Sequence, residues 1–349
     1  MLNEDGTARD LIDGKYPAKV LNASHCDLDG VSSAIAVKNT FTDVTVTHMG
    51  YGYGISKFFK GLKEFPYKLN DYEIIIMTDL SMDVKLFSEF MQILGMAQYQ
   101  GRFIFLDHHE TSKPLHDPKN NIYVATEECG ASLTKVYLEN TFNVNLSHLD
   151  ELIKYTKDYD LWVHKYKQSK HLNYILDKYL SGGVNSGCER FVNNYIDGFS
   201  YKNIGDIEKQ IIIDKLESNK KIWDELEIIP YDNSKIGFTM IDGSFMNDIS
   251  DKILKDKKLD IDVVINFYPN KVGGSIRASG NVKGINLGKF LGIIGSDLGI
   301  SAGGHKLAAG FKVLALEYNM PVDKKIEITQ PIMENLAKYL VKTYPDLNK

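Results

Sequence analysis

The sequence has little cysteine, no long apolar run and no excess of positive charge. Its three cysteines, Cys26, Cys129 and Cys188, are widely spaced and odd in number, which argues against a disulfide framework and against a thiolate zinc site. No segment approaches the ~20 apolar residues of a membrane span, and the N-terminus has neither an apolar stretch nor a basic start. These absences predict an untargeted, soluble, cytoplasmic protein that does not bind membranes.

The charge balance limits the partners further. The chain carries 41 Lys and Arg against 46 Asp and Glu, a net charge of -5 at pH 7. Overall charge therefore does not draw it to duplex DNA or to an acidic membrane, and any nucleic-acid contact must be a local patch. At 349 residues with 43% hydrophobic composition, the chain is long enough for two domains of ~150 residues each.

Four short apolar runs predict the strands of the first domain. They are apolar at consecutive positions, as in strands buried on both faces, and the stretches between them have helical periodicity. The pattern predicts a doubly wound α/β fold with a parallel sheet, in which ligands bind at the carboxyl ends of the strands. The four runs are residues 18–25, 44–49, 73–80 and 102–109.

The rest of the chain is predicted to be mostly helical and then α/β. The charged stretch 204–227 is typical of one long connecting helix with a solvated face. We predict a catalytic domain at residues 1–185, a helical linker at 186–232 and a smaller α/β domain at 233–349. Other helices are expected at residues 131–140, 146–157, 171–180, 188–195, 245–257, 287–298 and 332–342, and further strands at 236–242, 262–268 and 274–279.

Polar clusters stand at the ends of several predicted elements. Taken singly, an Asp at such a junction is often only a helix cap. Adjacent carboxylates and imidazoles at a buried strand end, however, require a compensating charge, and acids at a helix C-terminus oppose the helix dipole. The clusters are His25, Asp27 and Asp29; Asp79; Asp107, His108 and His109; and Asp158 and Asp160.

These ligand types favour a hard or borderline divalent ion over structural zinc, because no thiolates accompany them. Six or seven ligands are too many for one ion. Two ions about 3.5 to 4 Å apart, sharing a carboxylate and a water, would use them and would suit in-line displacement at phosphorus. The expected cofactor is two Mn²⁺ ions, with Mg²⁺ or Co²⁺ as alternatives.

The ordered segments HCDLDG, TDLS, LDHH and DYDLW resemble the four motifs of the DHH phosphoesterase superfamily. GSIRAS followed by SAGGHKLAAGF resembles its DHH-associated C-terminal domain, so the resemblance covers most of the chain. It implies a metal-dependent phosphoesterase of the nanoRNase or RecJ-like type, with the active site in the cleft between the two domains.

The resemblance also implies roles for individual residues. One ion would be held by His25, Asp27 and Asp79, and a second by Asp29, Asp79, His108 and Asp158, with Asp79 bridging. Many members separate the first His from the first Asp by three residues, whereas only Cys26 intervenes here. Asp158 is preferred to Asp160 on its spacing to Trp162, and the choice between them stays open.

The remaining implied residues contact the substrate. His109 would face the scissile phosphate and Asp107 would orient a neighbouring imidazole. In the C-terminal domain the implied binding residues are Arg277, Ser279, Gly303, Gly304 and His305, of which Arg277 and His305 also assist catalysis. The alternative is that Gly303 and Gly304 form a turn, and that residues 308–310 permit tight packing. The stretch YGYG, residues 51–54, is either an aromatic stacking loop or a strand-to-helix turn.

We therefore predict a Mn-dependent phosphodiesterase that converts short oligonucleotides or dinucleotides to mononucleotides. Alternatives within the class are a single-strand exonuclease, a cyclic-dinucleotide phosphodiesterase and a nucleotide phosphatase. A noncatalytic nucleotide-binding protein is the alternative outside it. The expected partner is short single-stranded nucleic acid or a dinucleotide, and the sequence does not predict an oligomeric state.

Overall fold

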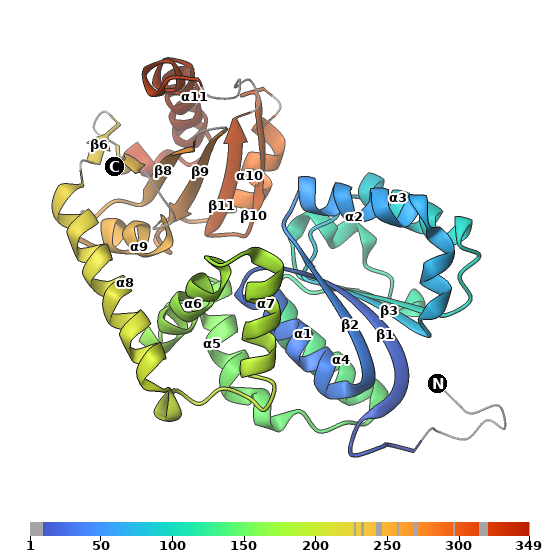
Figure 1. Cartoon of the computed structure of the whole chain (residues 1–349). Coiled ribbons are helices and arrows are strands. Elements are labelled where there is room, and N and C mark those ends of the chain that lie inside the picture. The colour runs from blue at the N-terminus through green and yellow to red at the C-terminus, as the bar shows by residue number, and fades with distance from the viewer. Residues whose placement is uncertain are drawn as a thin grey trace. The chain divides into compact units, whose positions relative to one another are not determined.

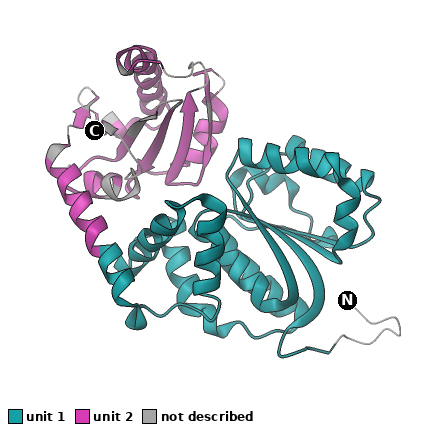
Figure 2. Ribbon diagram, in the orientation of Figure 1, with its two compact units in different colours: residues 1–212 teal, residues 213–349 magenta. Residues whose placement is uncertain are grey.

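The computed structural model describes residues 10–226, 228–231, 234–241, 246–256, 258–268, 271–295, 297–313 and 320–348. The chain divides into two compact units, residues 1–212 and 213–349, and the division falls within helix α8 (Asp206–Glu225) (Figure 2). The boundaries expected after residues 185 and 232 stay a prediction. Within the described residues, none of the helices combines the length and the apolar character needed to cross a membrane.

Unit 1 is built on a five-stranded sheet with the order β2-β1-β3-β4-β5, in which every neighbouring pair is parallel. The doubly wound parallel sheet predicted from the four apolar runs is therefore confirmed. The fifth strand is additional, and its three residues are too few to give a sequence signal. The strands are β1 (Tyr16–His25), β2 (Phe41–Met49), β3 (Ile74–Thr78), β4 (Arg102–Asp107) and β5 (Ile122–Val124).

Helices cover both faces of this sheet, which explains the continuous apolar runs. In β3, Ile74 and Ile76 belong to the core on one face, while Ile75 and Met77 belong to the core on the other, and all four are fully buried. Figure 1 shows α2 and α3 on one side and α1 and α4 on the opposite side. Alternate residues of a strand point to opposite faces, so both sets must be apolar.

The helices of unit 1 connect the strands and then form a helical layer of their own. The α-helices are α1 (Leu28–Thr40), α2 (Tyr53–Glu64), α3 (Val84–Met96), α4 (Gly130–Phe142), α5 (Asp150–Asp160), α6 (Lys167–Leu180) and α7 (Val184–Asn194). Short 3-10 segments are η1 (Pro66–Asp71), η2 (Glu110–Leu115), η3 (Pro118–Asn120), η4 (Ser147–Leu149) and η5 (Tyr201–Asn203).

Unit 2 contains a six-stranded mixed sheet with the order β10-β11-β9-β8-β7-β6, in which only β7 and β8 pair in parallel. The smaller α/β domain predicted at the C-terminus is confirmed. Its elements are β6 (Ile228–Pro230), β7 (Ile236–Ile241), α9 (Met246–Asp256), β8 (Ile261–Tyr268), β9 (Lys271–Ala278), α10 (Leu287–Ile294), β10 (Ile300–Gly304), β11 (Ala308–Val313), α11 (Val322–Thr343) and η6 (Pro345–Asn348).

Besides the three-residue strand β6, unit 2 differs from the prediction in two places. Residues 300–313 form the β10–β11 hairpin, whose Gly- and Ala-rich sequence lacks the β-branched residues that normally indicate strands. Helix α11 begins at Val322, ten residues before the predicted start, and includes Pro331 in its interior. Proline usually ends a helix, which is why the predicted helix began after it. The predicted ends at Asp242, Phe245 and Lys257 lie outside the described residues.

Candidate metal centre

Three polar clusters come together because three adjacent strands end at the same edge of the sheet. Strand β1 ends at His25, β3 is followed by Asp79, and β4 ends at Asp107 and is followed by His108 and His109. These strands are neighbours in the order β1-β3-β4 and run parallel. Their carboxyl ends therefore place the side chains together, as the sequence predicted.

Asp79 lies between two groups of ligand-type side chains. Its Oδ1 is 3.2 Å from His108 Nε2, and its Oδ2 is 3.8 Å from His25 Nδ1. The residue is 1% exposed and has a left-handed backbone with φ 55°. Asp tolerates this conformation better than most residues, but it remains strained, and such strain is common at functional sites. One carboxylate thus presents each oxygen to a different histidine.

The first group consists of His25, Asp27 and Asp79, each offering one ligand atom within 4.8 Å of the others. His25 Nδ1 lies 2.8 Å from Asp27 Oδ2, and Asp27 also caps helix α1 by accepting a hydrogen bond from the Gly30 N–H. A Cβ at Gly30 would stand 2.2 Å from the carbonyl oxygen of His25. Glycine is therefore required where helix α1 begins against the end of β1.

The second group consists of Asp29, His108 and Asp160. His108 Nε2 lies 3.3 Å from Asp29 Oδ2 and 3.6 Å from Asp160 Oδ2. The Asp29 carboxylate also accepts hydrogen bonds from the backbone N–H groups of Gly130 and Ala131, at the start of helix α4. A Cβ at Gly130 would stand 2.8 Å from both Asp29 Oδ2 and Asp79 Cβ. The helix N-terminus therefore fixes the orientation of Asp29.

Asp158, preferred over Asp160 on its spacing to Trp162, has different partners. Its carboxylate accepts hydrogen bonds from Lys165 N (2.9 Å), Tyr166 N (3.1 Å) and Ser169 Oγ (2.6 Å). The residue is 5% exposed. These contacts hold the turn that follows helix α5. The structure thus brings Asp160, and not Asp158, to the histidine.

A chain of hydrogen bonds links Asp107, His109 and Tyr51. His109 Nδ1 is 2.8 Å from Asp107 Oδ1, and its Nε2 is 3.0 Å from the Tyr51 hydroxyl. The Tyr51 ring also stacks on His25, with ring centroids 4.0 Å apart. If Asp107 accepts the Nδ1 proton, Nε2 is the acceptor for the Tyr51 hydroxyl. Asp107 thus lies where it can orient the His109 imidazole.

Burial and mutual repulsion dominate the electrostatics of this centre. Burial, followed by the charges of neighbouring aspartates, raises the pKa of Asp79 well above the ordinary range. Burial also raises the pKa of Asp160 well above that range, against the opposing charge of His108. Burial also raises the pKa of Asp29, against the opposing charge of His108. For His108, burial opposes the positive charge, but the surrounding aspartates, led by Asp160, raise its pKa. The group carries more negative charge than its imidazoles neutralise.

Two other acids are stabilised as carboxylates by histidine. Burial would raise the pKa of Asp107, but the charge and hydrogen bond of His109 outweigh it and lower the pKa to about 2. In the same way, His25 outweighs burial and lowers the pKa of Asp27. Within the described part of the chain, no Lys or Arg forms an ion pair with the five carboxylates of the centre, Asp27, Asp29, Asp79, Asp107 and Asp160.

The donor set fits divalent metal ions. Asp79 Oδ2 and Asp160 Oδ2 are buried, and neither has a hydrogen-bond donor among the described residues. Buried carboxylate oxygens without donors carry a large free-energy cost, which a cation would remove. Carboxylates and imidazoles are also the ligands that borderline and hard divalent ions prefer.

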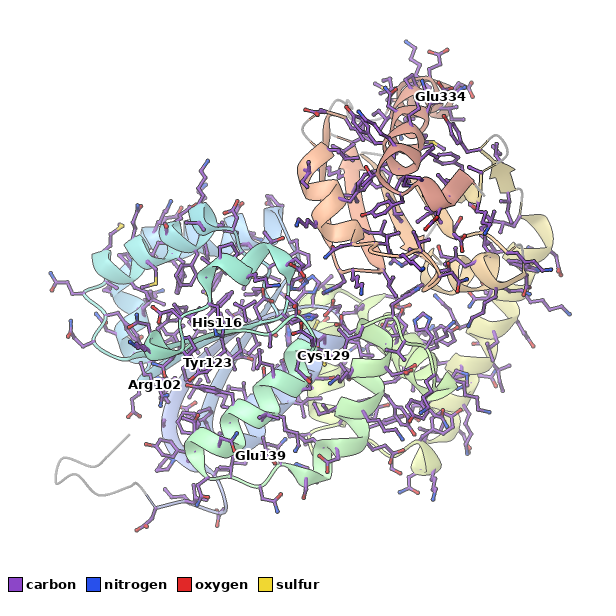
Figure 3. All side chains as sticks on the ribbon, turned by 180° about the vertical axis from the view of Figure 1, so that it is seen from behind. Arg102, His116, Tyr123, Cys129, Glu139 and Glu334 are labelled. Atoms are coloured by element: carbon purple, nitrogen blue, oxygen red, sulfur yellow. The ribbon has the colours of Figure 1, made fainter. Side chains whose placement is uncertain are left out.

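The cysteines do not contribute a thiolate. Burial, followed by the charge of Asp27, raises the pKa of Cys26 to about 11. Cys129 lies at the start of helix α4 (Figure 3), where its sulfur accepts a hydrogen bond from Ser132 N. Burial raises the pKa of Cys129 well above its ordinary value, so both groups remain neutral thiols at pH 7.

The predicted substrate-binding residues lie on or just after strands β9 and β10 of unit 2, which flank strand β11. Arg277, on β9, pairs with Ala308 on β11, and its Nη1 donates to the carbonyl oxygens of Ile276 and Ala309. The hydroxyl of Ser279, just after β9, donates to Asp260 Oδ1 at 2.7 Å.

Gly303 and Gly304 are strand residues rather than turn residues, paired with Gly310 and Ala309, and the backbone N–H of His305 donates to Ala308 O. A Cβ at Gly304 would stand 2.5 Å from Ala309 Cα, so tight packing explains this glycine. The alternative interpretation expected a turn at Gly303 and Gly304, which is wrong because both are strand residues. It also expected tight packing at residues 308–310, which agrees with the close approach of Gly304 to Ala309.

Three features of the centre were not predicted. The sequence does not indicate that Tyr51 contacts the histidines, although its position two residues after the end of strand β2 places it at the same sheet edge. The N-terminus of α4 at Gly130 and Ala131 follows β5, and this three-residue strand gave no signal. Asp160 was the less favoured of two acids whose sequence spacing could not separate them.

No protein-family model matches this chain, and no curated protein matches it. Among solved structures, the DHH domain of a protein described as a member of the s1p family of ribosomal proteins has a TM-score of 0.61 at 14% identity, covering 93% of this chain and 87% of that one. RecJ from Thermus thermophilus in complex with Mn²⁺ has a TM-score of 0.50 at 12% identity, covering 92% of this chain and 52% of RecJ. The pGpG-specific phosphodiesterase PggH from Vibrio has a TM-score of 0.48 at 13% identity, covering 91% of this chain and 99% of that one.

At these identities the matches to the DHH domain and to RecJ establish the fold and leave the activity open. This chain spans about half the length of RecJ. It has the fold of DHH-domain proteins, with a parallel-sheet unit, a helical segment and a second mixed-sheet unit. The fold implied by the four sequence motifs is confirmed.

Proposed function

We propose that this protein is a metal-dependent phosphodiesterase that hydrolyses short oligonucleotides or dinucleotides to mononucleotides. The observation that supports it most is the position of Asp79. Its two oxygens face His108 and His25, and each histidine belongs to a separate group of three ligand-type side chains. This is the arrangement that a carboxylate shared between two divalent ions requires.

We assign the ligands to two ions. His25, Asp27 and Asp79 would hold the first, and Asp29, His108 and Asp160 would hold the second together with Asp79. This set differs from the one implied by the sequence motifs only in Asp160, which replaces Asp158. The RecJ structure that shares this fold is described as a complex with Mn²⁺, so manganese is the first ion to test for this chain.

When bound, two such ions would lower the pKa of a water molecule between them and offset negative charge on the phosphoryl oxygens. The protein supplies the rest. Asp29, fixed by the start of helix α4, and Asp79, fixed by its strained backbone, hold their carboxylates before substrate arrives. Prepositioned groups of this kind reduce the reorganisation that the reaction would otherwise need.

His109 is the proposed contact to the scissile phosphate. Asp107 accepts its Nδ1 proton, which directs Nε2 outward to the Tyr51 hydroxyl. A phosphate oxygen accepts hydrogen bonds, so it would contact His109 only when Nε2 carries a proton, and the Tyr51 hydroxyl would then no longer donate to that nitrogen. Asp107 is a positioning residue in this scheme, because it acts through the imidazole and does not touch substrate.

Unit 2 is the proposed substrate clamp. Arg277 on β9 offers a guanidinium to a phosphate oxygen, and Ser279 lies just after the same strand. Gly303, Gly304 and His305 lie on or just after β10, which β11 separates from β9. The net charge of -5 argues against a long basic track for nucleic acid, so a short substrate is preferred.

The test is a hydrolysis panel with Mn²⁺. It contains labelled di- and trinucleotides and longer strands of RNA and DNA, cyclic di-AMP and bisphosphoadenosine. Asp79→Asn is the blank, since it keeps the size of the side chain and removes the shared charge. Fastest conversion of the shortest oligonucleotides, lost in the blank, supports the proposal. Faster degradation of long strands would instead indicate a single-strand exonuclease. Selective cleavage of cyclic di-AMP or of bisphosphoadenosine would indicate a cyclic-dinucleotide phosphodiesterase or a nucleotide phosphatase. No hydrolysis of any member would favour a noncatalytic nucleotide-binding protein.

A further inference from the structure

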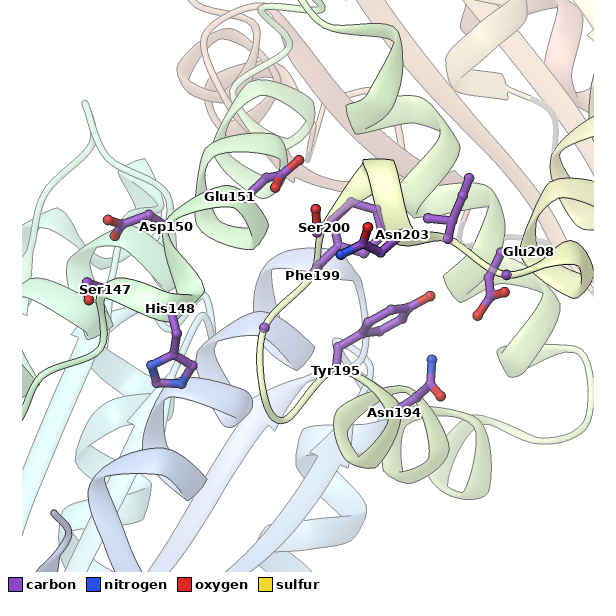
Figure 4. Close-up of a pocket in the computed structure, with 13 residues that line it drawn as sticks. Ser147, His148, Asp150, Glu151, Asn194, Tyr195, Phe199, Ser200, Asn203 and Glu208 are labelled. Atoms are coloured by element: carbon purple, nitrogen blue, oxygen red, sulfur yellow. The ribbon is translucent and has the colours of Figure 1, made fainter. Parts of the chain in front are cut away.

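Unit 1 contains a second hollow, built from residues that the proposed reaction does not use. Its volume is about 570 Å³. It lies among the segment that begins helix α5, the loop that follows helix α7 and the start of helix α8 (Figure 4). None of the proposed metal ligands lines it. A volume of this size is within the range of ~300 to 1,000 Å³ that is typical of small-molecule sites.

The walls of the hollow carry negative charge. Asp150 and Glu151 stand on one wall and Glu208 on another, as Figure 4 shows, and the lining contains no Lys or Arg. Asp150 is partly offset by Lys135 at 3.1 Å, and Glu151 accepts a hydrogen bond from Tyr201 N at 3.2 Å. Such walls repel phosphate and carboxylate ligands and favour a cation.

Tyr195 gives an independent indication of a ligand. The residue is 7% exposed, and its hydroxyl has no hydrogen-bond partner among the described residues. In Figure 4 the ring extends into the hollow with its hydroxyl toward Glu208. Burial and then the charges of Glu208 and Tyr179 raise the pKa of Tyr195, and the nearby Asn194 amide, which opposes this rise, does not reach the geometry of a hydrogen bond to the hydroxyl. The phenol is thus neutral and available to accept a hydrogen bond from a donor in the hollow.

The lining includes the aromatic rings of Tyr195 and Phe199. The Tyr195 ring contacts those of Phe191 and Phe199, with centroids 4.7 and 5.4 Å away. Gly198, with φ 95°, brings this loop against His148, because a Cβ there would stand 2.3 Å from the His148 carbonyl oxygen. Aromatic faces beside carboxylates suit an ammonium group attached to an aliphatic chain.

The arrangement of the acids favours an organic cation over a metal ion. In the described part of the chain, the groups of His, Cys, Asp and Glu that lie close enough to share one ion include none of the acids of this hollow. Charges on opposite walls, with aromatic surface between them, instead match a molecule with a positive charge at each end. We propose that the hollow binds an aliphatic diamine or polyamine, with one ammonium group beside Glu208 and Tyr195 and another beside Asp150 and Glu151.

The test is calorimetric titration of the full chain, saturated with Mn²⁺ so that the acids of the metal centre are occupied. Putrescine is the probe. Butylamine is a control that lacks one of its two charges, and butanediol is a control that lacks both. We expect saturable binding of putrescine, at least about tenfold weaker binding of butylamine, and none of butanediol. Glu208→Gln should weaken putrescine binding by about tenfold and Tyr195→Phe by about fivefold.

Asp79→Asn is the matched control, because it alters the metal centre and leaves the hollow intact. Unchanged putrescine binding by this variant supports a separate site. The proposal is overturned if putrescine shows no saturable binding up to about 10 mM, or if Glu208→Gln binds it as wild type does. Loss of binding in Asp79→Asn would also overturn it, because the diamine would then occupy the metal centre. Far-ultraviolet circular dichroism of each variant checks that it is folded.

Discussion

Two acids of one helix, Asp158 and Asp160, should respond in opposite ways to the same substitution. Asp158→Asn replaces a carboxylate that accepts three hydrogen bonds and is 5% exposed. The amide keeps an acceptor for Lys165 N but places a donor against Tyr166 N. Hydrogen bonds to a charged group contribute about 1.5 to 3 kcal/mol each, so we expect a loss of about 3 kcal/mol. For a unit of this size that lowers Tm by roughly 6 to 12 °C.

Asp160→Asn should leave the metal-free fold at least as stable. Its carboxylate has a raised pKa, because burial, together with the charges of Asp29 and Asp27, outweighs the attraction of His108. Removing that charge relieves repulsion, but it also removes a proposed ligand, so Mn²⁺ affinity should fall at least about tenfold.

The assay measures Tm of metal-free protein by circular dichroism and Mn²⁺ affinity by calorimetry, for both variants and wild type. The reasoning predicts low Tm with near-normal affinity for Asp158→Asn, and normal Tm with low affinity for Asp160→Asn. A reversed pattern would refute the assignment of Asp160 and restore Asp158 as the ligand.

Three further predictions concern pH and a neighbouring tyrosine. Burial raises the pKa of Asp79 and of Asp160, so metal-free stability should fall as pH rises above about 4, where the unfolded carboxylates ionise. Manganese should accordingly raise Tm more at pH 7.5 than at pH 5, and equal shifts would contradict this. In unit 2, burial raises the pKa of Asp262 to about 6, despite hydrogen bonds from Ser250 and Thr239 and the nearby charge of Arg277. Between pH 4 and pH 7.5, the free energy of unfolding of wild type should therefore fall by about 3 kcal/mol relative to that of Asp262→Asn, as measured by urea unfolding. A difference between the two proteins that stays constant with pH would contradict the raised pKa of Asp262. Tyr51→Phe keeps the stacking on His25 and removes the hydrogen bond to His109, so kcat for a dinucleotide should fall about fivefold with KM little changed. A change confined to KM would show that Tyr51 acts in binding.

The sequence predicted the part of the site that depends on strand ends. Consecutive apolar residues indicated β1, β3 and β4, and parallel strands bring their carboxyl ends to one edge. The convergence of His25, Asp79 and His108 follows from that geometry alone. The two oxygens of Asp79 facing different histidines could not be predicted, because that depends on its left-handed backbone.

The sequence could not decide between acids on a helix. Residues two apart, such as Asp158 and Asp160, point about 200° apart around the axis, so one faces the sheet edge and the other faces away. Which one faces the edge depends on the turn after α5, where Trp162 and His164 have positive φ and carry Lys165 N to Asp158. Sequence spacing to Trp162 does not contain that information.

Anomalous diffraction at the manganese edge, from crystals soaked in MnCl₂, tests the central claim most directly. The account predicts two peaks about 3.5 to 4 Å apart. One should lie beside His25 and Asp27, the other beside His108 and Asp160, with Asp79 in contact with both. A single peak, or a second peak beside Asp158 instead of Asp160, would contradict the proposed centre.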